Sequence, residues 1–178
     1  MSDWQPGDKR PDTASMLRVN QAGEYGATRI YAGQLAVLGR GSAAAHQIAR
    51  MATQEERHLE RFNRMMADRG VRPTALQPLW NVAGFALGAA TALMSEKAAM
   101  ACTDAVETEI DRHYGEQLEQ LGASDPELAA DIAEFRAEEL EHRAIAREHG
   151  AQETIAYPVL SAAIRAGCRV AIELSKRI

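Results

Sequence analysis

The sequence predicts an all-α protein, and three observations support this prediction. Alanine, which has the lowest free-energy cost in a helix, provides 34 of the 178 residues. The β-branched residues that favour strands are scarcer, with 24 Val, Ile and Thr together. No stretch alternates apolar and polar residues with the period of a half-buried strand. A β-sandwich or β-barrel is therefore excluded, and the length corresponds to one domain.

Two helices are expected in the N-terminal part. Residues 1–12 contain two prolines and a glycine among charges, and they predict a flexible arm before a domain that covers residues 13–178. A first helix is expected over residues 13–38, where a Gly-Arg-Gly segment stops it. Ser42 can cap a second helix, which runs to about residue 69 because Gly70 follows.

Three more helices complete the pattern. A third, notably long helix is expected from about Leu79 to Leu121. A fourth opens at a capping box of sequence Ser-Asp-Pro-Glu, residues 124–127, and closes near Gly150. A last helix covers roughly residues 154–177. The chain thus predicts four helices that could form a bundle, with an amphipathic helix added at the C-terminus.

Residues 73–95 form a long run without a single charge. As a helix this run would span about 35 Å, at ~1.5 Å per residue, which is enough to cross a bilayer. The run is rich in Ala and Gly rather than Leu and Ile, and it includes two prolines and several polar residues. Three interpretations stay open: a transmembrane span, an apolar surface that meets a membrane or another subunit, and a buried core helix.

The C-terminal helix has a mostly basic stripe on a broad apolar surface. The stripe consists of Arg165, Arg169, Glu173 and Lys176, at spacings of four and three. Such a helix suits the headgroup boundary of an anionic membrane. An ordinary core helix with a solvated edge is the alternative.

Charge, cysteines and the N-terminal residues narrow the function classes. The net charge of −5 gives no basic field for nucleic acid. Cys102 and Cys168 stand alone, which argues against a zinc ribbon or a disulfide scaffold. The first residues show neither a secretory signal nor an Arg-rich transit pattern, so we expect a protein that stays where it is made or a mature form.

Two helices each carry a Glu three residues before a His. The pairs are Glu55/His58 and Glu139/His142, and residues at this spacing lie about 5–6 Å apart on one face of a helix. A single pair of this kind is usually a surface pair. Glu56 is expected to face away from its histidine, whereas Glu138 is a second choice for the ligand in the fourth helix.

The surroundings of the two pairs repeat as well. The interval from Glu24 to Glu55 is almost the same as the interval from Glu107 to Glu139. The second half of the chain therefore repeats these acidic residues of the first half at a nearly constant distance along the sequence, which is called the offset below. An antiparallel bundle would bring four Glu and two His to one level, and buried carboxylates without a cation are prohibitively costly. One Glu from each of two helices and Glu-x-x-His from the other two is the ligand set of a carboxylate-bridged dinuclear site. Oxygen ligands with one imidazole per metal favour iron or manganese. The predicted ligands are Glu24, Glu55, His58, Glu107, Glu139 and His142. The hypothesis for their roles takes Glu55 and Glu139 as the bridging candidates and Glu24 and Glu107 as terminal or bridging ligands.

Four segments carry a resemblance to a known family. They are Met-Leu-Arg-Val-Asn-Gln-Ala-Gly-Glu-Tyr-Gly-Ala-Thr-Arg-Ile-Tyr-Ala at 16–32, Glu-Glu-Arg-His at 55–58, Glu-Glu-Leu-Glu-His at 138–142 and Ala-Gly-Cys-Arg-Val-Ala-Ile at 166–172. From about residue 14 to the end, the chain resembles the demethoxyubiquinone hydroxylases of ubiquinone biosynthesis. The resemblance implies a ferritin-like di-iron monooxygenase with two Fe ions per chain. Its substrates would be O₂ and a polyprenyl methoxy-methyl-benzoquinol, hydroxylated on its ring.

The resemblance also implies site residues and partners. It selects the same six ligands and adds His113 and Tyr114 for electron or proton delivery, against the alternative of a surface histidine. Trp80, Phe85 and Leu87 would line the mouth for the quinone. The resemblance implies NADH as the ultimate reductant, and no Gly-x-Gly-x-x-Gly turn is present to bind it. It implies a peripheral protein on the cytoplasmic side of a bacterial inner membrane, or on the matrix side of the mitochondrial one, with a homo-oligomer or a pathway protein as partner.

Two functions of other classes compete. A soluble ferritin or rubrerythrin relative for iron storage or peroxide detoxification would use much the same ligands, but it would not need the uncharged run. Rubrerythrins usually add a Cys-x-x-Cys iron site, which this sequence lacks. A non-catalytic, membrane-associated bundle is the third interpretation.

Overall fold

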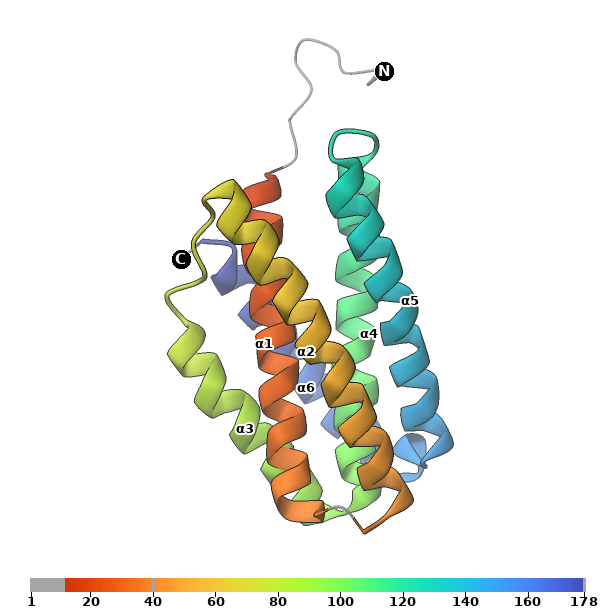
Figure 1. Cartoon of the computed structure of the whole chain (residues 1–178). Coiled ribbons are helices and arrows are strands. Elements are labelled where there is room, and N and C mark those ends of the chain that lie inside the picture. Colours follow the sequence, from red (N-terminus) through yellow and green to blue (C-terminus); the bar gives the residue numbers. More distant parts are fainter. Residues whose placement is uncertain (1–11, 40, 178) are drawn as a thin grey trace.

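The computed structural model describes residues 12–39 and 41–177, and every regular element within them is a helix. The prediction of an all-α fold is confirmed, and the architecture is that of a ferritin-like bundle with a C-terminal helix (Figure 1). The predicted arm lies outside the described residues except for Asp12, whose side chain caps the first helix by accepting from the Ser15 N–H at 3.0 Å. The elements are α1 (Thr13–Leu38), α2 (Ala43–Arg69), α3 (Gln77–Met94), α4 (Glu96–Leu121), α5 (Pro126–Glu148), the 3₁₀ turn η1 (Ala151–Glu153) and α6 (Tyr157–Ser175).

Four long helices form two antiparallel pairs, α1 with α2 and α4 with α5 (Figure 1). The loops that close the pairs follow the predicted signals. Ser42 caps α2 by accepting from the Ala45 N–H at 3.1 Å, and Gly70 ends it in the left-handed conformation, at φ 65°. Helix α5 begins one residue later than its predicted capping box, because Asp125 rather than Ser124 accepts from the Leu128 N–H.

Two of the three apolar clusters in the described core form layers with a polar level between them. On α2, for example, Ile48 and Met51 belong to one layer and Phe62 and Met65 to the other, and all four are at most 2% exposed. The other three long helices cross both layers in the same way. Apolar packing on both sides therefore fixes the height at which the intervening polar side chains meet.

The prediction of one long third helix is wrong, because the chain breaks at Ser95. This residue has an extended backbone, and its hydroxyl accepts from the Ala98 N–H at 3.0 Å to cap α4. Only α4 continues in the bundle, whereas α3 lies along the outside of α1 (Figure 1). The Ala-rich composition conceals the break because it favours a helix on both sides of it.

Glycines allow α1 and α3 to approach closely. A Cβ atom at Gly88 would lie 1.9 Å from the carbonyl oxygen of Ile30, and one at Gly33 would lie 2.2 Å from that of Phe85. Both distances are far inside van der Waals contact, so no larger residue fits without separating the helices. The small residues of the uncharged run therefore serve helix packing on one face of α3.

Helix α3 has 18 residues, shorter than the uncharged run, because residues 71–74 form no regular structure and the turn at residues 75–76 precedes it. None of the helices in the described part of the chain is long and apolar enough to span a bilayer. Helix α6 packs on α4 and α1, and it is shorter than the predicted range of 154–177.

Candidate metal centre

The polar level of the bundle holds the six side chains that the repeat selects. Helix α1 provides Glu24, α2 provides Glu55 and His58, α4 provides Glu107, and α5 provides Glu139 and His142. Each is at most 1% exposed. The bundle therefore brings together residues that lie far apart in the sequence, from the first long helix to the last.

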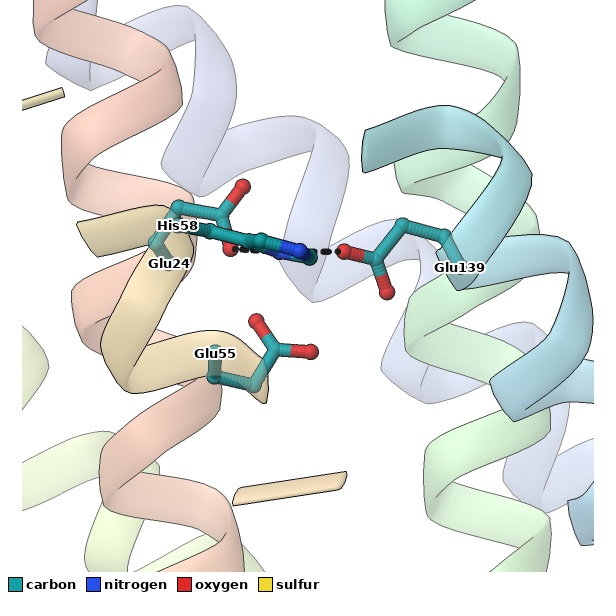
Figure 2. Close-up of side chains that lie close together, drawn as sticks. All are labelled: Glu24, Glu55, His58 and Glu139. Atoms are coloured by element: carbon teal, nitrogen blue, oxygen red, sulfur yellow. Dashed lines mark ion pairs between the residues drawn. The ribbon is translucent and has the colours of Figure 1, made fainter. Parts of the chain in front are cut away.

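The imidazole nitrogens point into the carboxylates. Nδ1 of His58 lies 3.4 Å from Oε2 of Glu24 and 3.2 Å from Oε1 of Glu139, as Figure 2 shows. Nδ1 of His142 lies 3.2 Å from Oε1 of Glu55 and 2.9 Å from Oε2 of Glu139. Both histidines thus present the same ring nitrogen to a common centre.

The six residues form two overlapping groups whose donor atoms lie within 4.8 Å of one another. One group contains Glu24 and His58, the other contains Glu107 and His142, and both share Glu55 and Glu139. The shared pair are the residues that the sequence predicts as bridging candidates. Such an arrangement matches two adjacent metal positions that have two carboxylates in common.

The donor atoms fit a cation because most of them lack any other partner. Eight buried atoms of the six residues accept or donate no hydrogen bond, although buried polar atoms nearly always do. They include both carboxylate oxygens of Glu55 and of Glu139 and Nδ1 of both histidines. Two divalent ions would balance the four carboxylates and satisfy these atoms.

Without a cation, the pKa values of the cluster residues are shifted in different directions. Burial and the neighbouring Glu139 raise the pKa values of Glu55 and Glu107 well above the usual range. Burial alone would lower the pKa of His58, but Glu139 and Glu24 outweigh it and raise it to about 10. Burial opposes ionisation of Glu139 too, yet His142 and His58 lower its pKa to about 2. The cluster thus retains protons that a bound cation would displace.

Two buried tyrosines donate hydrogen bonds to the cluster, each to the glutamate of the other helix. The phenol of Tyr31 on α1 donates to Oε1 of Glu107 at 2.9 Å, and the phenol of Tyr114 on α4 donates to Oε1 of Glu24. Each tyrosine lies seven residues after the glutamate of its own helix, so the two tyrosines obey the same offset as the two glutamates. Sequence reasoning missed Tyr31, although this offset from Tyr114 could have found it.

His113 lies apart from the cluster that its neighbour Tyr114 contacts. It is 7% exposed, so the alternative of a surface histidine is wrong. Its Nε2 lies 2.8 Å from the Gln117 amide, which bonds to Asn20, and it lines a polar cavity of about 230 Å³. Burial, with a smaller contribution from Lys176, lowers the pKa of His113 to about 4, so the ring is neutral at pH 7.

Glu56 and Glu138, the glutamates next to the predicted ligands Glu55 and Glu139, both lie outside the cluster. Glu56 is exposed, as predicted. Glu138 accepts hydrogen bonds from the Arg57 guanidinium, and it meets His58 at Nε2, on the side of the ring opposite the carboxylates. Neither residue belongs to the two groups of donor atoms.

An apolar cavity of about 520 Å³ lies where α3 and α6 pack on α1 and α4. Its walls come from α1, α3, α4 and α6, and they include Gly23 and Val106, the immediate neighbours of two cluster glutamates. Trp80 and Leu87 line it as predicted, whereas Phe85 does not. The only acidic or basic side chain in the wall is Glu109, among the described residues.

Part of the predicted basic stripe of α6 is paired within the chain. Arg165 and Arg169 donate to Oε1 of the buried Glu109, at 2.7 and 3.3 Å, and Lys176 donates to Glu173 at 2.5 Å. The two arginines thus hold α6 against α4 beside the cavity.

Fold and site define a class: a ferritin-like helical bundle whose interior carboxylates and histidines can hold metal. Comparison with known proteins is consistent with this class and narrows it. The family described as "Ubiquinone biosynthesis protein COQ7" matches residues 11–175, and the chain belongs to this family.

Its relatives have closely related names. The "3-demethoxyubiquinol 3-hydroxylase" of Rhodospirillum rubrum is 56% identical over 178 residues, which cover 99% of this chain and 84% of that protein. The "NADPH-dependent 3-demethoxyubiquinone 3-hydroxylase, mitochondrial" of Homo sapiens is 54% identical over 167 residues, with 92% and 76% covered. The "5-demethoxyubiquinone hydroxylase, mitochondrial" of Saccharomyces cerevisiae is 41% identical over 179 residues, with 92% and 77% covered.

Proposed function

We propose that this chain is an enzyme that uses O₂ to hydroxylate the ring of a demethoxyubiquinol, a polyprenyl methoxy-methyl-benzoquinol. One observation carries the proposal: helices α1 and α4, which supply Glu24 and Glu107 to the buried carboxylate–histidine cluster, also wall a large apolar cavity. The cluster can hold metal ions, and the cavity can hold a ring with an apolar tail while excluding water. The names of the relatives describe this hydroxylation.

The metal ions are proposed to be two irons, one in each group of donor atoms. Glu24 and His58 would hold one, Glu107 and His142 the other, and Glu55 and Glu139 would bridge them. Oxygen ligands with one imidazole per ion favour iron or manganese, and the oxidative reaction favours iron. Bound there, iron would supply the activation of O₂.

The surrounding residues would position the ligands and the substrate. Tyr31 and Tyr114 fix one oxygen each of Glu107 and Glu24, which leaves the second oxygen free for metal. Tyr114 and His113 are proposed to deliver electrons or protons, as the family resemblance implies. Tyr114 contacts the cluster, and His113 lines the polar cavity together with its partner Gln117.

The protein is proposed to bind peripherally to a membrane through α3 and α6. Both helices wall the cavity, and both expose large apolar side chains, including Val82 at 69%, Leu93 at 74% and Val159 at 71% exposure. A substrate with a polyprenyl tail partitions into lipid, so a cavity that adjoins this surface could receive it directly. The membrane would be the bacterial inner membrane on its cytoplasmic side, or the mitochondrial inner membrane on its matrix side.

A reduced nicotinamide is proposed as the source of electrons. The family resemblance implies NADH, whereas the names of several relatives specify NADPH. The same exposed surface could also serve a second copy of the chain or another protein of the pathway.

The experiment measures product in liposomes that contain the demethoxy quinol. The chain, loaded anaerobically with ferrous iron, receives ¹⁸O₂ and either NADH or NADPH, and mass spectrometry follows the lipid. We expect a quinol that gains one ¹⁸O atom. Glu139→Ala should abolish this gain, whereas Glu134→Ala, which removes an exposed carboxylate of the same helix, should preserve it.

Two results would contradict the proposal. One is equal product with Glu139→Ala and the unaltered chain. The other is an absence of product together with the accumulation of mineral iron, which would favour the storage function. The apolar cavity between α1, α3, α4 and α6 has no role in storage, and for this reason hydroxylation is the better interpretation.

A further inference from the structure

Hydrogen bonds outside the cluster fix both histidine rings. Nε2 of His58 lies 3.0 Å from Oε2 of Glu138, and Nε2 of His142 lies 3.1 Å from Oε1 of Gln54. Both oxygens accept, so each Nε2 carries a proton. In the neutral form of each ring, which is the form that binds a metal, the lone pair is therefore on Nδ1, on the side of the carboxylates. Glu138 and Gln54 therefore hold both rings in the tautomer that can bind metal.

These contacts cross between helices with approximate twofold symmetry. Gln54 on α2 lies four residues before His58 but bonds to His142 on α5. Glu138 on α5 lies four residues before His142 but bonds to His58 on α2. The two acceptors are therefore separated in the chain by the same interval as the two histidines.

The hydrogen bonds that reach the cluster from other side chains differ between the two halves in one respect. Four hydrogen bonds join the six cluster residues to other side chains in the described part of the chain, two from tyrosines and two at the histidines. Both halves of the sequence supply a tyrosine at the equivalent position. The six cluster residues likewise match in type between the two halves, at a nearly constant interval along the sequence. Of these four hydrogen bonds, only the two behind the histidines differ in the chemical nature of the partner, since one acceptor is a carboxylate and the other a neutral amide.

The two acceptors, Gln54 and Glu138, also contact each other, and neighbouring groups fix how each acceptor faces its histidine. The Gln54 amide donates to Oε2 of Glu138 at 3.2 Å, which fixes its own oxygen toward His142. Arg57 donates to Oε1 of Glu138 and leaves Oε2 to His58. A carboxylate that accepts from an imidazole N–H increases the electron density on the other ring nitrogen more than an amide oxygen does.

We propose that Glu138 and Gln54 make the two metal positions unequal, so that the position at Glu24 and His58 binds a divalent ion first and more tightly. The proposal rests on the dinuclear site proposed above. Glu138 and Gln54 act as positioning residues, because each acts through a histidine rather than on the metal.

The test titrates the apoprotein anaerobically with ⁵⁷Fe(II) and records Mössbauer spectra at one and at two equivalents. We expect one quadrupole doublet to dominate at one equivalent and a second to appear at two. In Glu138→Gln, tight binding of the first ion should weaken about 10–100-fold, with both doublets present from the start. The matched control is Glu134→Gln, which also removes a carboxylate from Arg57 but touches neither histidine.

A double variant, Gln54→Glu with Glu138→Gln, keeps the hydrogen bond between the two acceptors and exchanges their positions. We expect its two doublets to fill in the reverse order. Equal filling of two positions in the unaltered chain, or an unchanged order in the double variant, would overturn the inequality while leaving the dinuclear site intact. Fewer than two irons bound to the unaltered chain would overturn the dinuclear site and this inference with it.

Discussion

The protons that the cluster retains predict how the stability of the apoprotein depends on pH. The neighbouring carboxylates raise the pKa of His58 from 6.5 to about 10 in the folded chain. A group whose pKa is raised on folding contributes stability that is fully present below its unfolded pKa, and this stability is lost as the pH rises through the folded value. The free energy of unfolding of the apoprotein should therefore fall between pH 6.5 and 10.

The magnitude follows from the shift. Within this window each pH unit removes at most about 1.4 kcal/mol, and less near pH 6.5, where the unfolded histidine is half-protonated. His58 alone therefore accounts for a loss of about 2 kcal/mol between pH 6.5 and 8.5. The raised pKa values of Glu55 and Glu107 act in the same direction. Since 1 kcal/mol shifts the melting temperature of a chain of this length by about 2–4 °C, the loss at His58 alone should lower the melting temperature by about 4–8 °C.

The assay is urea unfolding of chelator-treated protein at pH 6.5, 7.5 and 8.5, followed by circular dichroism. His58→Gln should flatten the slope, and metal-loaded protein should show little slope because Nδ1 then holds no proton. A free energy of unfolding that stays constant or increases from pH 6.5 to 8.5 in the unaltered apoprotein would refute the reasoning.

Three further predictions concern separate parts of the molecule. Tyr114→Phe should weaken iron binding about tenfold in equilibrium dialysis, because Glu24 loses the phenol that orients it, and unchanged affinity would contradict this role. Gly88→Ala should destabilise the chain by about 1–3 kcal/mol in urea, whereas Gly167→Ala, with no atom within 4 Å of the added Cβ, should not; equal effects would refute the close approach of α1 and α3. Val82→Asp should reduce flotation with anionic liposomes about tenfold while iron binding stays intact, and unchanged flotation would remove α3 from the membrane surface.

The six cluster residues could be predicted from the sequence because the spacing between them repeats along the chain. The nearly constant offset between the two halves and the Glu-x-x-His spacing locate Glu24 and Glu107 without any coordinates. Helix ends at Ser42 and Gly70 were equally predictable, since capping hydroxyls and left-handed glycines act locally. Helical periodicity and local caps together therefore gave most of the bundle.

The errors arose where tertiary packing outweighs local preference. Nothing in the helix propensity around Ser95 distinguishes a break from a continuous helix, and α3 leaves the bundle because its glycines pack on α1. The roles of Gln54 and Glu138 depend on contacts between α2 and α5, which no spacing within one helix reveals. Phe85 does not line the cavity for a similar reason. The packing of α3 on α1 decides which face of α3 is directed toward the cavity.

One cluster between the four long helices is proposed to hold two metal ions. Anomalous X-ray diffraction at the iron edge, from crystals loaded anaerobically with ferrous iron, tests it most directly. We expect two anomalous peaks about 3.5–4 Å apart, one beside Glu24 and His58 and one beside Glu107 and His142, with Glu55 and Glu139 reaching both. A single peak, or peaks outside the six side chains, would contradict it.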